Sequence, residues 1–127
     1  MENKLGTILN PMKRIITLLF FFILTSCGNN CDEIPNSFSN YDRAKEIVLS
    51  SNFKLTDKAD VSGSSWITSA KYFSCDDLSG FFVIETGNRT YIHQDMPYEV
   101  WENFKNANSK GSFYSRHIRG NYQLKLN

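Results

Sequence analysis

The chain has 127 residues, of which 14% are aromatic, and it carries a formal net charge of +1 at pH 7. This length allows one small domain, and the aromatic residues help a small core to bury enough apolar area. Three of the 14 basic residues and one of the 13 acidic residues precede Cys27, which leaves 11 basic and 12 acidic residues and a net charge of −1 from there onward. A nearly neutral chain argues against strong nonspecific binding to nucleic acid, which depends on neutralising phosphates.

The N-terminal sequence is typical of an exported protein. Lys13 and Arg14 precede an apolar run over residues 15–24, and a basic flank before such a run is the pattern of a signal peptide. The run is too short for an ordinary transmembrane helix, which needs about 20 apolar residues. Residues 24–27, Leu-Thr-Ser-Cys, resemble the lipobox of bacterial lipoproteins. The resemblance implies a lipoprotein signal peptide over residues 1–26, cleavage before Cys27 and lipidation of its sulfur; the alternative is a plain signal peptide or anchor with an incidental cysteine.

Export also bears on the other two cysteines. Once Cys27 carries lipid, Cys31 and Cys75 remain, and both would lie in a compartment that permits disulfides. The sequence allows either a Cys31–Cys75 disulfide or two free thiols. Two cysteines and two distant histidines show no metal-ligand spacing, so we predict no metal site and no cofactor.

The segment between the lipidation site and the main module divides into a tether and a lead-in. Residues 27–39 are polar and rich in turn formers, which favours a short tether that holds the domain off the bilayer. Residues 40–60 are predicted to contain a helix over about residues 41–51, capped by Asn40, and then a short strand over residues 53–56.

Residues 61–127 are predicted to form the main module. Turn residues separate three segments rich in β-formers, which are residues 65–73, 78–85 and 90–93. Met96 is the expected N-cap of a helix that has Pro97 at its first position, and Ser109 is expected to cap a second helix over residues 110–119. The predicted fold class is α+β, with a small three-stranded antiparallel sheet packed against two C-terminal helices and an N-terminal lead-in helix.

An ordered series of residues in this module resembles the KTSC domain. The series consists of Ser64-Ser65, Tyr72, Gly87, Tyr91, Pro97, Ser109-Lys110-Gly111, Phe113, Ile118-Arg119 and Tyr122. That family is named for its occurrence at the C-terminus of some lysyl-tRNA synthetases, which has suggested RNA binding, and it also occurs as a stand-alone bacterial module. The resemblance implies no catalytic residues and no established function. Its Tyr-x-Tyr centre reads Tyr91-Ile92-His93 in this chain.

The first candidate site is therefore the predicted strand over residues 90–93. In a paired strand, Tyr91 and His93 project from one face and Ile92 from the other. A tyrosine and a histidine side by side can bind a ligand by stacking and hydrogen bonding. The alternative is a structural tyrosine beside a half-exposed histidine.

The second candidate site is a basic surface near the C-terminus. Five basic residues and no acidic ones follow residue 102. Arg116 and Arg119 are three residues apart and so share one side of the predicted helix. With Lys110 and Tyr122 nearby, they form the kind of surface that holds a phosphate, a nucleic-acid strand or an anionic lipid.

Structural interpretations compete with this second site. The basic side chains could form a solvated face, or Arg119 could pair with Asp95 or Glu99. The sequence Ser109-Lys110-Gly111-Ser112 suggests a phosphate-binding loop, but it lacks the glycine spacing of a P-loop. A helix cap at Ser109 is the favoured interpretation.

The chain contains no G-x-S-x-G, H-E-x-x-H or C-x-x-C motif, and we predict no catalytic residue. We expect a lipid-anchored membrane protein of the bacterial cell envelope that faces the periplasm or the cell surface. Its KTSC-like module would bind an unknown protein or an anionic ligand. The alternatives are nucleic-acid or phosphate binding through the basic helix, which export disfavours for nucleic acid, and a small hydrolase built on a histidine.

Overall fold

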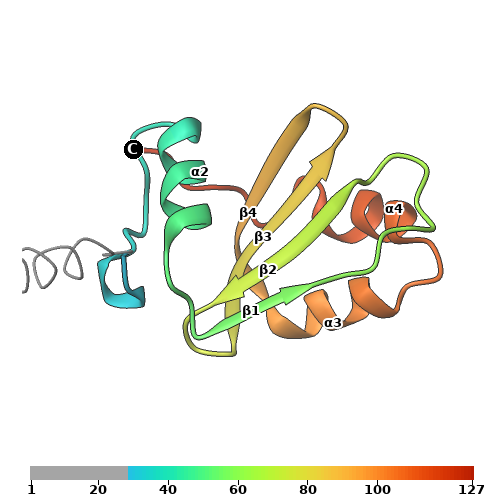
Figure 1. The fold of residues 1–127 in the computed structure, drawn as a ribbon, viewed down its shortest axis with the longest axis horizontal. Coiled ribbons are helices and arrows are strands. Elements are labelled where there is room, and N and C mark those ends of the chain that lie inside the picture. Colours follow the sequence, from blue (N-terminus) through green and yellow to red (C-terminus); the bar gives the residue numbers. More distant parts are fainter. Residues whose placement is uncertain (1–28) are drawn as a thin grey trace, which may run out of the picture.

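The computed structural model describes residues 29–127 of the chain. Cys27, the residues that resemble a lipobox and the predicted signal peptide lie outside the described residues. The described part contains four strands and three α-helices, joined by turns and loops (Figure 1). The strands are β1 (Leu55–Lys58), β2 (Ser69–Ser74), β3 (Ser79–Thr86) and β4 (Arg89–Pro97). The helices are α2 (Tyr41–Ser50), α3 (Tyr98–Asn106) and α4 (Lys110–Phe113), with a 3-10 turn η2 (Cys31–Glu33) near the start and a π-helical turn η3 (Tyr114–Ile118) that continues α4.

The sheet has four antiparallel strands in the order β1-β2-β3-β4, which corrects the prediction of three. The additional strand is β1, which pairs with β2 from Leu55 opposite Ser74 to Lys58 opposite Lys71. The short strand that the sequence predicts in the lead-in therefore joins the sheet. Asp57 also attaches β1 to α3, since its carboxylate accepts hydrogen bonds from the indole of Trp101 and the ammonium group of Lys105, at 2.8 and 2.7 Å.

Each face of the sheet carries its own core. Helices α3, α4 and η3 cover one face, while α2 and the N-terminal segment lie against the other (Figure 1). The core under the C-terminal helices is built mainly on Tyr72, Phe82, Ile84, Trp101 and Phe104. The core under α2 is built mainly on Phe38, Val48, Phe73, Val83 and Ile92. Residues 82 to 84 of β3 are all buried, because consecutive side chains of this strand face the two cores in turn.

The helix starts follow local signals with one correction. Asn40 and Ser109 act as the predicted N-caps, since their side chains accept hydrogen bonds from the backbone N–H groups three residues ahead, at 2.8 and 3.2 Å. Pro97, rather than Met96, is the N-cap of α3. Pro97 still lies in β4 opposite Ser79, and the N–H of Tyr98 donates to the carbonyl of Leu78 at 2.9 Å, so pairing with β3 carries the strand one residue further than the proline rule predicts.

The two ends of the described chain are held side by side. Residues 29–39, most of the predicted tether, lie against the domain, with Phe38 only 2% exposed in the core under α2. The N–H of Phe38 donates to the carbonyl of Lys125, and the N–H of Asn127 donates to the carbonyl of Phe38, both at 2.9 Å. Among residues 29–127 no helix is long and apolar enough to cross a membrane.

Candidate binding pocket between the β1–β2 loop and α4

A cavity of about 590 Å³ lies between the loop that joins β1 to β2 and the start of α4. Residues of the loop form one wall and residues of α4, η3 and the turn before them form the other. The lining residues are Asp60, Gly63, Ser64, Ser65, Trp66, Asn108, Ser109, Lys110, Gly111, Ser112, Ser115 and Arg116. The pocket therefore combines many hydroxyl groups with one indole ring, two cationic side chains and one carboxylate.

Side chain to backbone hydrogen bonds shape the loop wall. The hydroxyl of Ser64 accepts from the N–H of Ile67 at 3.1 Å, and the carboxylate of Asp60 accepts from the N–H of Ser62 at 3.0 Å. Such bonds replace those of a regular strand and stabilise turns. The hydrogen bond from the backbone of Ser62 also lowers the pKa of the Asp60 carboxyl, so that this wall carries a negative charge at neutral pH.

Gly111 explains how the two walls come close. An added Cβ at Gly111 would lie 2.5 Å from Nε1 of Trp66, so only glycine lets the indole lie this near the helix backbone. The same indole meets the ring of Tyr114 edge to face, with centroids 5.9 Å apart. Trp66 remains 41% exposed and is therefore an aromatic surface that a ligand can reach.

The helix wall supplies the positive charge. Lys110 and Arg116 both line the cavity, and neither takes part in an ion pair among residues 29–127. Two cationic groups beside an aromatic ring and several hydroxyls can bind a polar ligand that carries negative charge. Neither histidine lines this pocket, and within the described residues no three His, Cys, Asp or Glu side chains gather to hold a metal ion.

His93 is a buried residue and not the half-exposed histidine that the sequence suggests. It shares a sheet face with Tyr91, since their partners on β3 are Phe82 and Ile84, both in the core under the C-terminal helices. His93 is only 8% exposed, and its Nε2 lies 3.0 Å from the hydroxyl of Tyr114. Burial lowers the pKa of the imidazole, which favours a neutral, structural ring. Tyr91 is 38% exposed nearer the hairpin end.

The other predicted site residues also lie away from the pocket. Arg119 is exposed at the end of η3, and its proposed partner Asp95 instead pairs with Lys125 at 2.6 Å. Tyr122 is partly buried against the core under the C-terminal helices. Its backbone has φ 53°, and its carbonyl accepts a hydrogen bond from the N–H of Gln94 at 2.9 Å.

Of the six candidate binding residues, the structure brings only Lys110 and Arg116 to the pocket. Ser109, Gly111 and Ser112, from the segment considered as a phosphate-binding loop, line it as well. Sequence reasoning missed Trp66 because it placed this residue in a strand over residues 65–73, whereas β2 begins at Ser69. The Ser-Gly-Ser-Ser run before Trp66 is a turn signal that could have revealed the loop.

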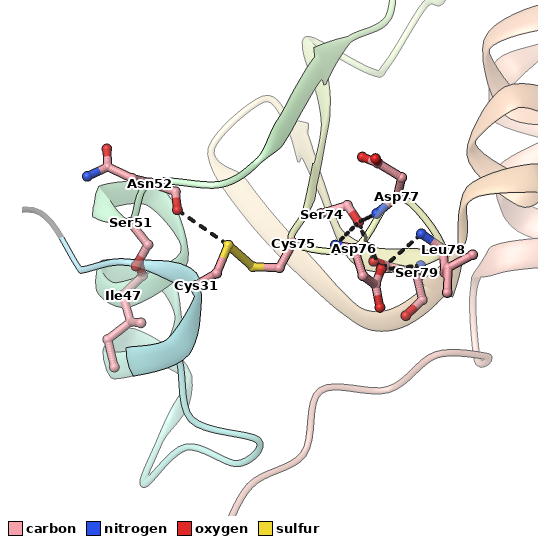
Figure 2. The surroundings of a disulfide bond; sticks show 10 residues. All are labelled: Cys31, Ile47, Ser51, Asn52, Ser74, Cys75, Asp76, Asp77, Leu78 and Ser79. Atoms are coloured by element: carbon pink, nitrogen blue, oxygen red, sulfur yellow. Dashed lines mark hydrogen bonds between the residues drawn. A yellow bond between two sulfur atoms is a disulfide. The ribbon is translucent and has the colours of Figure 1, made fainter.

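A Cys31–Cys75 disulfide lies at the opposite end of β2 from this pocket, with Cα atoms 5.7 Å apart (Figure 2). Aspartate side chains stabilise the turn beside it. The carboxylate of Asp76 accepts hydrogen bonds from the N–H groups of Leu78 and Ser79, at 2.9 and 3.1 Å. These bonds lower the pKa of the Asp76 carboxyl, so the turn carries a fixed negative charge.

Comparison with known proteins supports the domain family. The KTSC domain matches residues 83–122, which run from the middle of β3 through η3 and include the helix wall of the pocket. The matched region is shorter than the predicted module over residues 61–127, and it leaves out the loop that carries Trp66. No curated protein and no solved structure shows a significant match to the chain.

Proposed function

We propose that this chain is an exported lipoprotein of the bacterial cell envelope whose KTSC-type domain binds an anionic group in the Trp66 pocket. The observation that carries the binding proposal is the meeting of two sequence segments. Ser64-Ser65 and Ser109-Lys110-Gly111 lie 45 residues apart in the chain, and both line one cavity. The same two segments are part of the series that resembles the KTSC domain, which favours a shared role in binding.

The chemistry of the pocket favours a ligand with a carboxylate or phosphate group. Lys110 offers an ammonium group and Arg116 a planar guanidinium, which suit oxyanions. The carboxylate of Asp60 on the facing wall repels a second negative group and favours a hydrogen-bond donor there. A ligand with one anionic end and a hydroxyl or amide group beside it therefore fits best, whether it is a small molecule or a side chain of a partner protein.

The indole N–H groups of the two tryptophans allow a direct test. Trp66 lines the pocket, whereas Trp101 is buried and donates to Asp57 at 2.8 Å, so its signal is an internal reference. We expect titration with inorganic phosphate or a short acidic peptide to shift the Trp66 indole resonance in an NMR spectrum and leave that of Trp101 in place. Shifts of equal size at both indoles, or at neither, would contradict the proposal.

A matched pair of variants tests the role of charge. Replacing both Lys110 and Arg116 by alanine should weaken binding about tenfold or more, since each charged hydrogen bond contributes about 1.5–3 kcal/mol. Arg119→Ala removes an exposed cation outside the pocket and should leave binding unchanged. If Arg119→Ala weakens binding as much as the double variant does, the site lies on the helix surface and not in the pocket.

The lipid anchor has a separate test. The expected mature chain begins at Cys27 and carries acyl groups, which mass spectrometry of the protein purified from membranes detects. Cys27→Ser should leave an uncleaved precursor, as should inhibition of lipoprotein signal peptidase. A Cys27→Ser protein that matures normally and stays on the membrane would rule out lipidation.

The second candidate function is nucleic-acid or anionic-surface binding through the outer side of the C-terminal helix. It is favoured by the exposure of both Arg116 and Arg119, which form no ion pairs within residues 29–127. Changing both arginines to glutamate should abolish binding to single-stranded RNA in a salt-dependent assay. A wild-type protein that shows no salt-dependent RNA binding would remove this candidate.

A further inference from the structure

The disulfide lies very close in sequence to the proposed lipidation site. Only three residues separate Cys27 from Cys31, and a chain spans at most about 3.5 Å per residue, so the reach between them is about 14 Å. Cys31 is bonded to Cys75 in the turn that joins β2 to β3. This turn therefore cannot move far from a lipid attached to Cys27.

We propose that the Cys31–Cys75 disulfide fixes the orientation of the domain on the membrane, with the β2–β3 turn toward the lipid and the Trp66 pocket away from it. This inference rests on the proposed lipidation of Cys27. The β2–β3 turn then contacts the headgroup layer of the bilayer that holds the lipid anchor.

The disulfide is the feature that shortens the connection. Without it, the first residue buried in the core is Phe38, which lies 11 residues after Cys27 and allows a reach of about 38 Å. Non-covalent contacts also hold the segment. The N–H of Asn52 donates to the carbonyl of Asn29 at 2.7 Å, the side-chain amide of Gln94 donates to the carbonyl of Asn36 at 2.8 Å, and Ile34 packs against the core under α2. Each such hydrogen bond contributes only about 1 kcal/mol, so these contacts open more readily than a covalent bond.

The turn itself has a surface suited to a headgroup layer. Leu78 is 74% exposed, the largest value among the exposed large hydrophobic side chains within residues 29–127. Both backbone groups of Leu78 are bonded, since its N–H donates to Asp76 and its carbonyl accepts from Tyr98, so the turn holds this exposed side chain on a fixed backbone. Asp76 and Asp77 precede Leu78, and Asp77 pairs with Lys54 at 2.9 Å. Because buried charges are costly, these side chains keep the turn at the level of the headgroups.

Strand β2 separates the turn from the pocket. The pocket loop, with Trp66, precedes β2, and Cys75 follows it, so the two features lie at opposite ends of the same strand (Figure 1). Six residues of strand at about 3.3 Å each give a separation of about 20 Å. A domain held by its β2–β3 turn thus opens its pocket to the aqueous compartment, where a ligand or partner can enter.

Fluorescence quenching measures this orientation in the full-length lipidated protein. The protein is reconstituted in phosphatidylethanolamine–phosphatidylglycerol vesicles that contain a lipid with a nitroxide on its headgroup. One sample is the wild type, in which Trp66 reports on the pocket end. The other carries Trp66→Phe with Leu78→Trp and reports on the turn end, while Trp101 stays buried in both and contributes the same background.

We expect the Leu78→Trp sample to be quenched at least twofold more strongly than the wild type, and reduction with dithiothreitol to shrink that difference. Equal quenching, or stronger quenching of Trp66, overturns the orientation. A difference that survives full reduction unchanged overturns the role of the disulfide. Mass spectrometry of the same preparation separates these outcomes from failure of the anchor proposal, because absence of acyl groups on Cys27 overturns both, whereas reversed quenching with the lipid present overturns only the orientation.

Discussion

Lowering the pH from 7.5 to 5.0 should weaken the folded state through the buried imidazole of His93. The ring lies 5.8 Å from that of Phe82 and forms a hydrogen bond with Tyr114, and burial lowers its pKa below the ordinary value. In the unfolded chain a histidine has a pKa of about 6.5. The unfolded state therefore takes up a proton at a higher pH than the folded state does. Stability is complete above about pH 6.5 and falls as the pH drops toward the folded-state pKa.

The size of this effect has an upper limit. If the ring stays neutral in the folded protein down to pH 5.0, protonation of the unfolded chain lowers the free energy of unfolding by about 2 kcal/mol. That is a measurable part of the 5–15 kcal/mol typical of a domain. The carboxyl groups of Asp57 and Asp76 have lowered pKa values, so the stability they contribute is lost only at more acidic pH, as the pH falls through those values.

Urea unfolding followed by circular dichroism at pH 7.5, 6.5, 5.5 and 5.0 gives the required free energies. The chain contains two histidines, which provides a matched control. His93→Phe should remove most of the pH dependence in this range, whereas His117→Gln, a change at an exposed position on η3, should retain it. The reasoning is refuted if His93→Phe keeps the wild-type pH dependence or if His117→Gln abolishes it.

Three further changes test what holds the fold together, each read as the change in unfolding free energy. Tyr41→Phe removes a hydroxyl that donates to the carbonyl of Thr90 at 2.8 Å and accepts a backbone N–H of β4 at 2.6 Å, so we expect a loss of about 1–3 kcal/mol; no loss would mean that water replaces the hydroxyl. Changing Cys31 and Cys75 to serine opens a closed loop of about 45 residues and should cost up to about 4 kcal/mol, with dithiothreitol giving the same loss in the wild type but none in the variant. Asp57→Ala should cost about 1–3 kcal/mol because it leaves the Trp101 indole N–H without its acceptor, whereas Asp57→Asn should cost less than about 1 kcal/mol; equal losses would contradict this account.

Features that depend on residues close together in the chain were predictable from the sequence, and features that depend on distant residues were not. The caps at Asn40 and Ser109 were predictable because each bonds a backbone N–H only three residues ahead. The turn at Asp76 was predictable for the same reason. The start of α3 was misplaced by one residue because pairing of Pro97 with Ser79, a contact between distant residues, overrides the local preference of proline.

The exposure of the candidate site residues depends on tertiary contacts, which the alternation of side chains along a strand does not predict. Alternation along β4 places Tyr91 and His93 on one face, but it does not say how far the C-terminal helices reach along that face. The helices bury His93 under Tyr114 and stop short of Tyr91. His93, which its position in the predicted strand suggested to be half-exposed, is therefore a core residue.

The sequence by itself determined the α+β composition, the helix caps, the turn chemistry and the resemblance to the KTSC domain, because these depend on residues within a few positions of one another. The expected export signal and the resemblance of residues 24–27 to a lipobox are predictions from the sequence alone. Tertiary structure decided that β1 joins the sheet and that Trp66 lies on Gly111 to form a pocket. Each of these needs two segments that are more than ten residues apart to meet, and their meeting depends on how both cores pack against the sheet.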